Sequence, residues 1–144
     1  MATVSVAAVL GGKGVLGGLS RPTPALAQLV REGLPAESLL RLAERLDLRQ
    51  AEISARIGIP QRTLTRRLAR RERLTAAESD RTVRLAQVFA NAAETLGSET
   101  KAAEWLKTPN RALRGERPLD QLDTDPGVRE VEDVLGRIAY GVYS

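Results

Sequence analysis

The sequence contains neither cysteine nor histidine, and each absence removes a class of chemistry. Without cysteine there is no disulfide, no thiolate nucleophile and no cysteine-built metal site. Without histidine the chain lacks the commonest general base and the commonest metal ligand. No pair of carboxylates stands out for acid–base work in their place. We therefore expect a protein that is not an enzyme and that holds no metal and no cofactor.

Aromatic residues are also scarce, at 3% of 144 residues, and alanine, leucine and arginine take their place. This composition favours helix over sheet, and no segment alternates apolar and polar residues for long enough to predict a strand. We expect an all-α fold.

The sequence has no apolar run long enough to cross a membrane. Residues 2–10 are apolar, but no basic residue precedes them and glycines follow at once, which is not the pattern of a secretory signal. We expect a cytoplasmic protein in which residues 1–20 form a glycine-rich N-terminus that is mobile or loosely docked.

Start and stop signals divide the rest of the chain into helices. Gly33, Gly58 and Gly97 are each expected to end a helix, and Thr75 with Glu78 has the spacing of a capping box. The expected helices are 25–32, one that follows Pro35 and runs to about 46, 49–57, 60–71, 76–96, a short one around Trp105, and a final one from about 126 to 140.

Residues 49–71 have the layout of a helix-turn-helix motif, with Gly58 at the tight turn. Five apolar residues are expected to face inward and fix the angle between the two helices: Ile53, Ile57, Ile59, Leu64 and Leu68. The small Ser54 stands where the helices would cross closely.

The outward face of the second helix of this motif carries residue types that bind DNA. Gln61 and Arg62 lie at its N-terminal end, where glutamine suits adenine and arginine suits guanine. Six arginines and one acid lie between Gln61 and Arg73, which predicts phosphate contacts through residues such as Arg67 and Arg71. The candidate DNA-binding residues are Gln61, Arg62, Thr63, Thr65, Arg66 and Arg70. An arginine-rich, solvated helix is the alternative, and it gains from Arg67, which stands where many such motifs carry a buried aliphatic residue.

Several short motifs follow one another from the middle of the chain to its C-terminal end. They are residues 62–64, 78–81, 84–86, 105–113, 118–120, 123–124, Gly127 and 135–144. Together, between residues 31 and 144, the chain resembles the Xre/MbcA/ParS family of antitoxins. It departs from the family pattern at Arg114, where the first of two glycines is expected, and at Ser54, where alanine is usual.

The resemblance implies a type II toxin–antitoxin system in which this chain neutralises a RES-domain toxin. Such toxins act on NAD⁺, either by degrading it or by transferring ADP-ribose from it, so NAD⁺ would be the toxin's substrate. The antitoxin's C-terminal end would cover the entrance to the toxin's active site, and the helix-turn-helix would repress the operon. The implied organisation is a helical domain at 21–97, with the motif at 49–71, and a toxin-binding domain at 98–144.

The C-terminal residues are compatible with this role. Tyr140 and Tyr143 are two of only four aromatic residues, and tyrosine offers a large contact area with a polar tip. The candidate toxin-binding residues are Arg137, Tyr140, Gly141, Val142, Tyr143 and Ser144. The alternatives are that Tyr140 and Val142 fold back onto the chain's own core, and that Arg137 pairs with Asp133. Trp105 is expected to be a core residue.

Two other functions remain open at this point. The chain could be a stand-alone helix-turn-helix repressor whose C-terminal helices only dimerise it, or a structural interaction protein that does not bind DNA. A homodimer is expected for a helix-turn-helix protein that reads a palindrome, with operator DNA as its ligand. Helix 76–96 is the candidate dimer surface.

Overall fold

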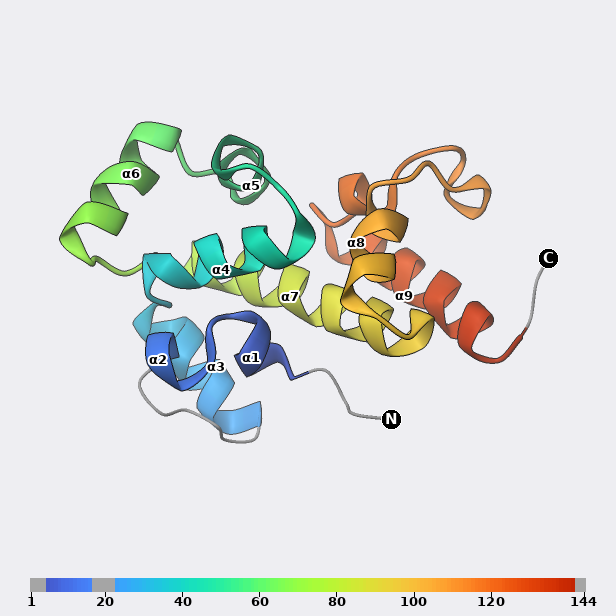
Figure 1. The fold of residues 1–144 in the computed structure, drawn as a ribbon, viewed down its shortest axis with the longest axis horizontal. Coiled ribbons are helices and arrows are strands. Elements are labelled where there is room, and N and C mark those ends of the chain that lie inside the picture. The colour runs from blue at the N-terminus through green and yellow to red at the C-terminus, as the bar shows by residue number, and fades with distance from the viewer. Residues whose placement is uncertain (1–4, 17–22, 142–144) are drawn as a thin grey trace.

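The computed structural model describes residues 5–16 and 23–141, and the elements within these ranges are helices (Figure 1). They are α1 (Val6–Val9), α2 (Gly12–Leu16), α3 (Thr23–Glu32), α4 (Ala36–Leu46), α5 (Gln50–Ile57), α6 (Gln61–Arg70), α7 (Ala76–Leu96), α8 (Glu99–Leu106), the 3₁₀ turns η1 (Arg111–Leu113) and η2 (Pro118–Gln121), and α9 (Asp125–Ala139). β-Pairing in the described residues is limited to two isolated bridges. The all-α prediction is confirmed.

The helix ends follow local signals in the sequence. Thr75 and Glu78 form the predicted capping box at the start of α7, and Gly97 ends that helix with φ 94°. Gly33 ends α3 at a point where the chain passes close to a later segment. A Cβ at Gly33 would lie 2.2 Å from the carbonyl oxygen of Leu74, so only glycine fits there.

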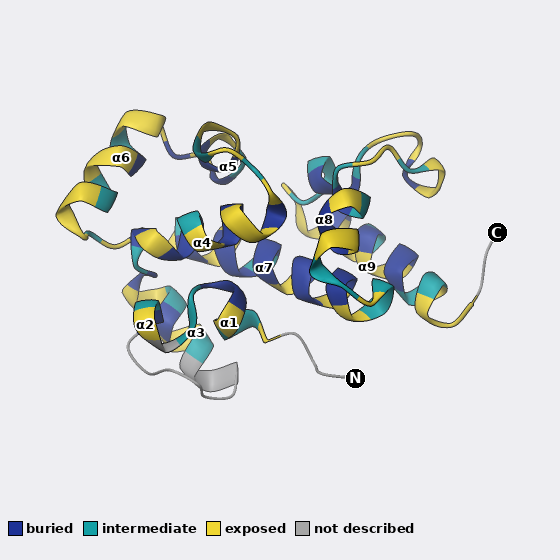
Figure 2. Cartoon of the chain, in the orientation of Figure 1, coloured by how far each residue is buried: buried dark blue, intermediate teal, exposed yellow. Residues whose placement is uncertain are grey.

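Helix α7 is the centre of the fold (Figure 2). It packs against α1, α3 and α4 on the side of the N-terminal half and against α8 and α9 on the other, and Phe89 is fully buried among them. The exposed residues of α7 are Ala76, Ala77, Asp80, Arg81, Gln87, Asn91 and Glu94. The apolar residues of α7 pack within this chain, so a dimer through helix 76–96 would use its exposed residues, and that dimer surface stays a prediction. None of the helices in 5–16 and 23–141 is long and apolar enough to cross a membrane.

The described part of the N-terminal segment is docked on the core, and more firmly than the expectation of a mobile or loosely docked terminus. Val9 and Leu10 are fully buried and Leu16 is nearly so, and all three join the same core as α7. Arg45 of α4 fixes the segment by donating a hydrogen bond to the carbonyl oxygen of Ala8 at 3.2 Å. The sequence shows that residues 2–10 are apolar, but it does not show that the described ones among them pack against the core that α4 and α7 form. Residues 1–4 and 17–20 of the predicted mobile segment lie outside the described residues.

Candidate DNA-binding and partner-binding surfaces

Helices α5 and α6 form the predicted helix-turn-helix. Gly58 adopts the left-handed conformation at the end of α5, with φ 85°, and its N–H donates to the carbonyl oxygen of Ser54. The inward residues Ile53, Ile57, Ile59 and Leu64 are buried, while Leu68 is partly buried. Ser54, at the crossing of the helices, is also buried. The inner face of the motif is therefore packed, and the opposite face of α6 is presented to solvent.

That face carries the candidate DNA-binding residues. Of these candidates, Gln61, Arg62, Thr65, Arg66 and Arg70 are exposed. Thr63 is half-buried at the edge of this face. Arg62 and Arg66 form no ion pair with the residues that the structure describes, so their guanidinium groups are free to bind an anion. Gln50, the first residue of α5, donates a hydrogen bond to Thr65 Oγ1 at 3.3 Å and so ties the two helices together across this face.

Arg67 does not point toward solvent. Its Nη1 donates a hydrogen bond to Glu78 Oε1 at 2.5 Å, and both side chains are about 15% exposed. The aliphatic stem of Arg67 takes the place of the buried aliphatic residue expected there, and its charged head is paired. The prediction that Arg67 contacts phosphate is wrong. Its role is to attach α6 to the start of α7.

Glu78 is held from two sides. Its Oε1 accepts a hydrogen bond from the Thr75 backbone N–H at 2.8 Å as well as the one from Arg67. Burial alone would raise the pKa of the Glu78 carboxyl, but these hydrogen bonds and the Arg67 charge outweigh burial and lower it. Glu78 is therefore an ionised link between the helix-turn-helix and the central helix.

Replacing Glu78 by glutamine is expected to destabilise the protein at pH 7 by about 1–3 kcal/mol, because Arg67 would have no charged partner. The pKa of Glu78 is lowered by folding. Its contribution is therefore present above the unfolded-state pKa of about 4.3 and is lost as the pH falls through the folded-state pKa. The difference in free energy of unfolding between wild type and Glu78→Gln, measured by urea denaturation, should shrink below about pH 4.

Glu94→Gln is the matched control, since Glu94 is an exposed residue of the same helix. We expect it to change the free energy of unfolding by less than about 0.5 kcal/mol. A destabilisation by Glu78→Gln that stays constant from pH 7 to pH 3 would contradict the assigned ion pair.

A second set of ion pairs joins the helix-turn-helix to the C-terminal half. Asp120 of η2 accepts two hydrogen bonds from Arg117, at 2.8 and 3.0 Å, and pairs with Arg56 of α5. The hydrogen bonds of Arg117, and then of Arg56, lower the pKa of Asp120 against the opposing effect of burial. A groove of about 700 Å³ lies beside these residues, between α5, α7 and η2. Its arginines already bind Asp120 or backbone carbonyls, so we assign no ligand to it.

Helix α9 carries the C-terminal candidates to the end of the molecule opposite α6 (Figure 1). Thr124 caps the helix, and Val131 and Leu135 bury its inner face. Trp105 packs, partly buried, against the same core, as predicted. The positions of α6 and α9 leave room for two separate ligands.

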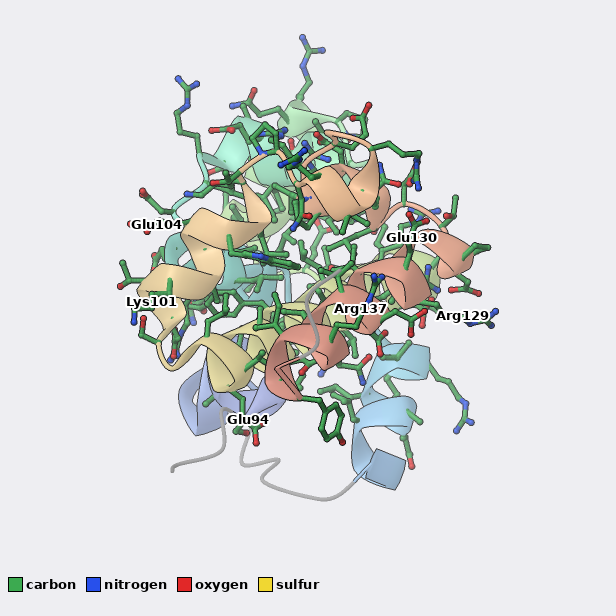
Figure 3. All side chains as sticks on the ribbon, turned by 90° about the vertical axis from the view of Figure 1, so that its right-hand side faces the viewer. Glu94, Lys101, Glu104, Arg129, Glu130 and Arg137 are labelled. Carbon is green, nitrogen blue, oxygen red and sulfur yellow. The ribbon has the colours of Figure 1, made fainter. Side chains whose placement is uncertain are left out.

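Tyr140, at the end of α9, is 86% exposed, an unusual state for a large aromatic residue. The alternative that Tyr140 folds back onto the core is therefore wrong. Arg137 is exposed too, and within the described residues it forms no ion pair, with Asp133 or with any other carboxylate (Figure 3). Gly141 is exposed and has φ 70°. The candidates Val142, Tyr143 and Ser144 lie outside the described residues.

Comparison with known proteins identifies a family for both the N-terminal and the C-terminal half of the chain. Residues 25–87 match the Antitoxin Xre-like helix-turn-helix domain, and residues 91–141 match the Antitoxin Xre/MbcA/ParS C-terminal toxin-binding domain. The Antitoxin Xre of Photorhabdus laumondii is 33% identical over 122 residues, which cover 84% of this chain and 82% of the relative. The chain belongs to the Xre/MbcA/ParS family of antitoxins. The Antitoxin Xre of Yersinia enterocolitica is 40% identical over 96 residues, covering 66% of this antitoxin and 65% of that protein.

Two further matches are a curated relative whose name mentions ADP-ribosylation and a solved toxin–antitoxin complex. The Prs ADP-ribosylating antitoxin of a Sphingobium species is 26% identical over 125 residues, covering 81% of this antitoxin and 79% of the relative. Among solved structures, the crystal structure of the M. tuberculosis MbcT–MbcA toxin–antitoxin complex holds a chain that matches with a TM-score of 0.57 and 26% identity. The match covers 76% of this antitoxin and 96% of that chain.

The two matched domains meet inside α7, between residues 87 and 91, so the central helix of this antitoxin contributes to both. The domain boundary expected from the sequence, between residues 97 and 98, stays a prediction. Two residues that support α6 escaped sequence reasoning. The sequence indicates Glu78 only as a cap, whereas its half-buried side chain also pairs with Arg67, and nothing in the sequence indicates the contact between Gln50 and Thr65.

Proposed function

We propose that this chain is the antitoxin of a type II toxin–antitoxin pair and covers the active-site entrance of a RES-domain toxin with residues 137–144. The exposure of Tyr140 carries the proposal, because it lies at the end of a domain matched as toxin-binding. A large amphipathic ring kept in solvent by the free protein is the kind of residue that anchors an interface. The antitoxin acts by binding and supplies no catalytic group, metal or cofactor.

The identity of the toxin rests on two supports. The motifs quoted from the sequence resemble a family whose members pair with RES-domain toxins. The Sphingobium relative is named for ADP-ribosylation, and NAD⁺ is the donor of ADP-ribose in that chemistry. The partner proposed here therefore consumes NAD⁺, whether by degrading it or by transferring ADP-ribose to a target.

Co-expression with the product of the neighbouring gene tests the proposal. We expect that protein alone to lower cellular NAD⁺ and stop growth, and the antitoxin to restore both. The two proteins should also purify together. A neighbour without a RES domain, or an NAD⁺ level that falls equally with and without the antitoxin, would contradict the proposal.

We also propose that the antitoxin, acting in the cytoplasm as a dimer, binds operator DNA through α6 and represses its own operon. The exposed arginines and Gln61 at the start of α6 support this function. A stand-alone repressor would present the same face, but it would not need an exposed Tyr140. Neutralisation of the neighbouring toxin separates these two functions, and sedimentation of the antitoxin with operator DNA tests the dimer.

A further inference from the structure

Helix α9 contains two glycines, and the fold explains only one of them. Glycine weakens a helix relative to alanine, so each needs a reason. A Cβ at Gly127 would lie 1.8 Å from the carbonyl oxygen of Gln121, so the chain's own backbone requires glycine there. A Cβ at Gly136 would meet nothing within 4 Å in the part of the chain that the structure describes, and its φ is an ordinary helical one.

Gly136 lies in the middle of the outer face of α9. Val131 and Leu135 bury the inner face, and the exposed residues of the helix surround Gly136 at three- and four-residue spacings. On the side of the previous turn these are Glu132 and Asp133, and on the side of the next turn Ala139 and Tyr140. The side-chain layer over this face therefore has a gap directly beside the exposed tyrosine.

Charged side chains stand around the gap. Arg129 lies two turns before Gly136 on the same face, and Arg137 lies beside it (Figure 3). Arg129, Asp133 and Arg137 form no ion pair with other residues that the structure describes, whereas Glu130, at the edge of the face, pairs with Arg114. Unpaired charges around a position that lacks a side chain are suited to fixing the orientation of a protein partner.

We propose that Gly136 is the point where the toxin's surface approaches the backbone of α9 most closely, with Tyr140 seated in the toxin one turn further on. This inference rests on the proposed function and extends the toxin-binding surface inward from the chain end, to the outer face of α9 between Arg129 and Tyr140. The glycine weakens the helix in the free antitoxin, but it lets the toxin approach the backbone of α9 more closely than any side chain at this position would allow.

The substitution Gly136→Ala tests this inference because it moves two measurements in opposite directions. The free antitoxin should become more stable, with a melting temperature raised by about 2–4 °C, since alanine favours the helix. Affinity for the toxin, measured by isothermal titration calorimetry with the intact toxin, should fall by about tenfold or more, because the added methyl group stands in a close contact. Gly136→Leu should weaken binding further.

Gly14→Ala is the matched control. Gly14 is an exposed helical glycine of α2, where a Cβ would also meet nothing within 4 Å among the described residues. It lies outside the matched toxin-binding domain. The same chemical change there should leave affinity for the toxin unchanged.

Two results would overturn the inference while the proposed function stands. One is a Gly136→Ala antitoxin that binds toxin as tightly as wild type. The other is a Gly136→Ala antitoxin with a lowered melting temperature, since a segment of this chain would then occupy the space. Failure of the wild-type antitoxin to bind the toxin would overturn the proposed function, and the inference with it.

Discussion

An antitoxin that lacks residues 140–144 is expected to fold normally and to fail in neutralising its toxin. Tyr140 and Gly141 are exposed, so their removal takes no described side chain out of the core. We expect the free energy of unfolding to change by less than about 0.5 kcal/mol. Removal of an aromatic interface anchor costs about 2–4 kcal/mol, so affinity should fall by about 30-fold to 1,000-fold.

The measurements are the melting temperature of the free antitoxin, its affinity for the purified toxin, and the growth of cells that express both. Tyr140→Phe is the informative control, because it keeps the ring and removes only the hydroxyl group. It should retain most of the affinity if the area of the ring dominates. Full neutralisation by the truncated antitoxin would show that the toxin is inhibited through another surface.

The double substitution Arg62→Ala with Arg66→Ala is expected to lower affinity for the operator by about 100-fold or more. Both side chains are exposed on the outer face of α6, and neither forms an ion pair within the described residues. An arginine paired with a guanine contributes about 1–3 kcal/mol, and an arginine bound to a phosphate makes binding more sensitive to salt. The slope of log K against log salt concentration should therefore become shallower by about one for each arginine–phosphate pair that the substitutions remove.

Arg31→Ala with Arg111→Ala is the matched control for charge. These two exposed arginines lie on α3 and η1, away from the recognition helix, and their removal lowers the net charge equally. Operator binding should fall by less than about threefold, since only long-range attraction is reduced. Unchanged operator binding in the α6 double variant would instead favour an interaction protein that does not bind DNA.

Most of the helix boundaries could be predicted because their causes are local. Gly33, Gly58 and Gly97 end helices in the structure as predicted, and Thr75 begins α7 with the predicted capping box. Each signal acts within one turn of its own residue, so it can be recognised in the linear sequence. The inward residues of the helix-turn-helix were predicted from spacing for the same reason.

What could not be predicted depends on contacts between distant segments. The docking of residues 5–16 needs a core that α4 and α7 build, and the burial of α7 needs helices from both halves of the chain around it. The pairing of Arg67 with Glu78 follows from the angle between α6 and α7, which no local pattern encodes. Periodicity shows which face of a helix is apolar, but not what covers it.

The candidate sites divide in the same way. The exposed face of α6 followed from the turn at Gly58 and the two inward leucines. Gly136 could not be selected from the sequence. What distinguishes it is that a Cβ there would contact none of the described residues, and this follows only from the packing of the folded chain.

The outer faces of α6 and α9, at opposite ends of the molecule, are expected to be lost together when the protein unfolds. Helix α7 fills the core under both, with Phe89 fully buried along it, so the halves should unfold together. A single protease cut within α7, or a cavity at Phe89, would therefore abolish both of the proposed activities, DNA binding and toxin binding, in the same event. Under the proposed function, a cell that degraded the antitoxin would release the toxin and relieve repression of the operon at the same moment, and new antitoxin would have to be made from that operon.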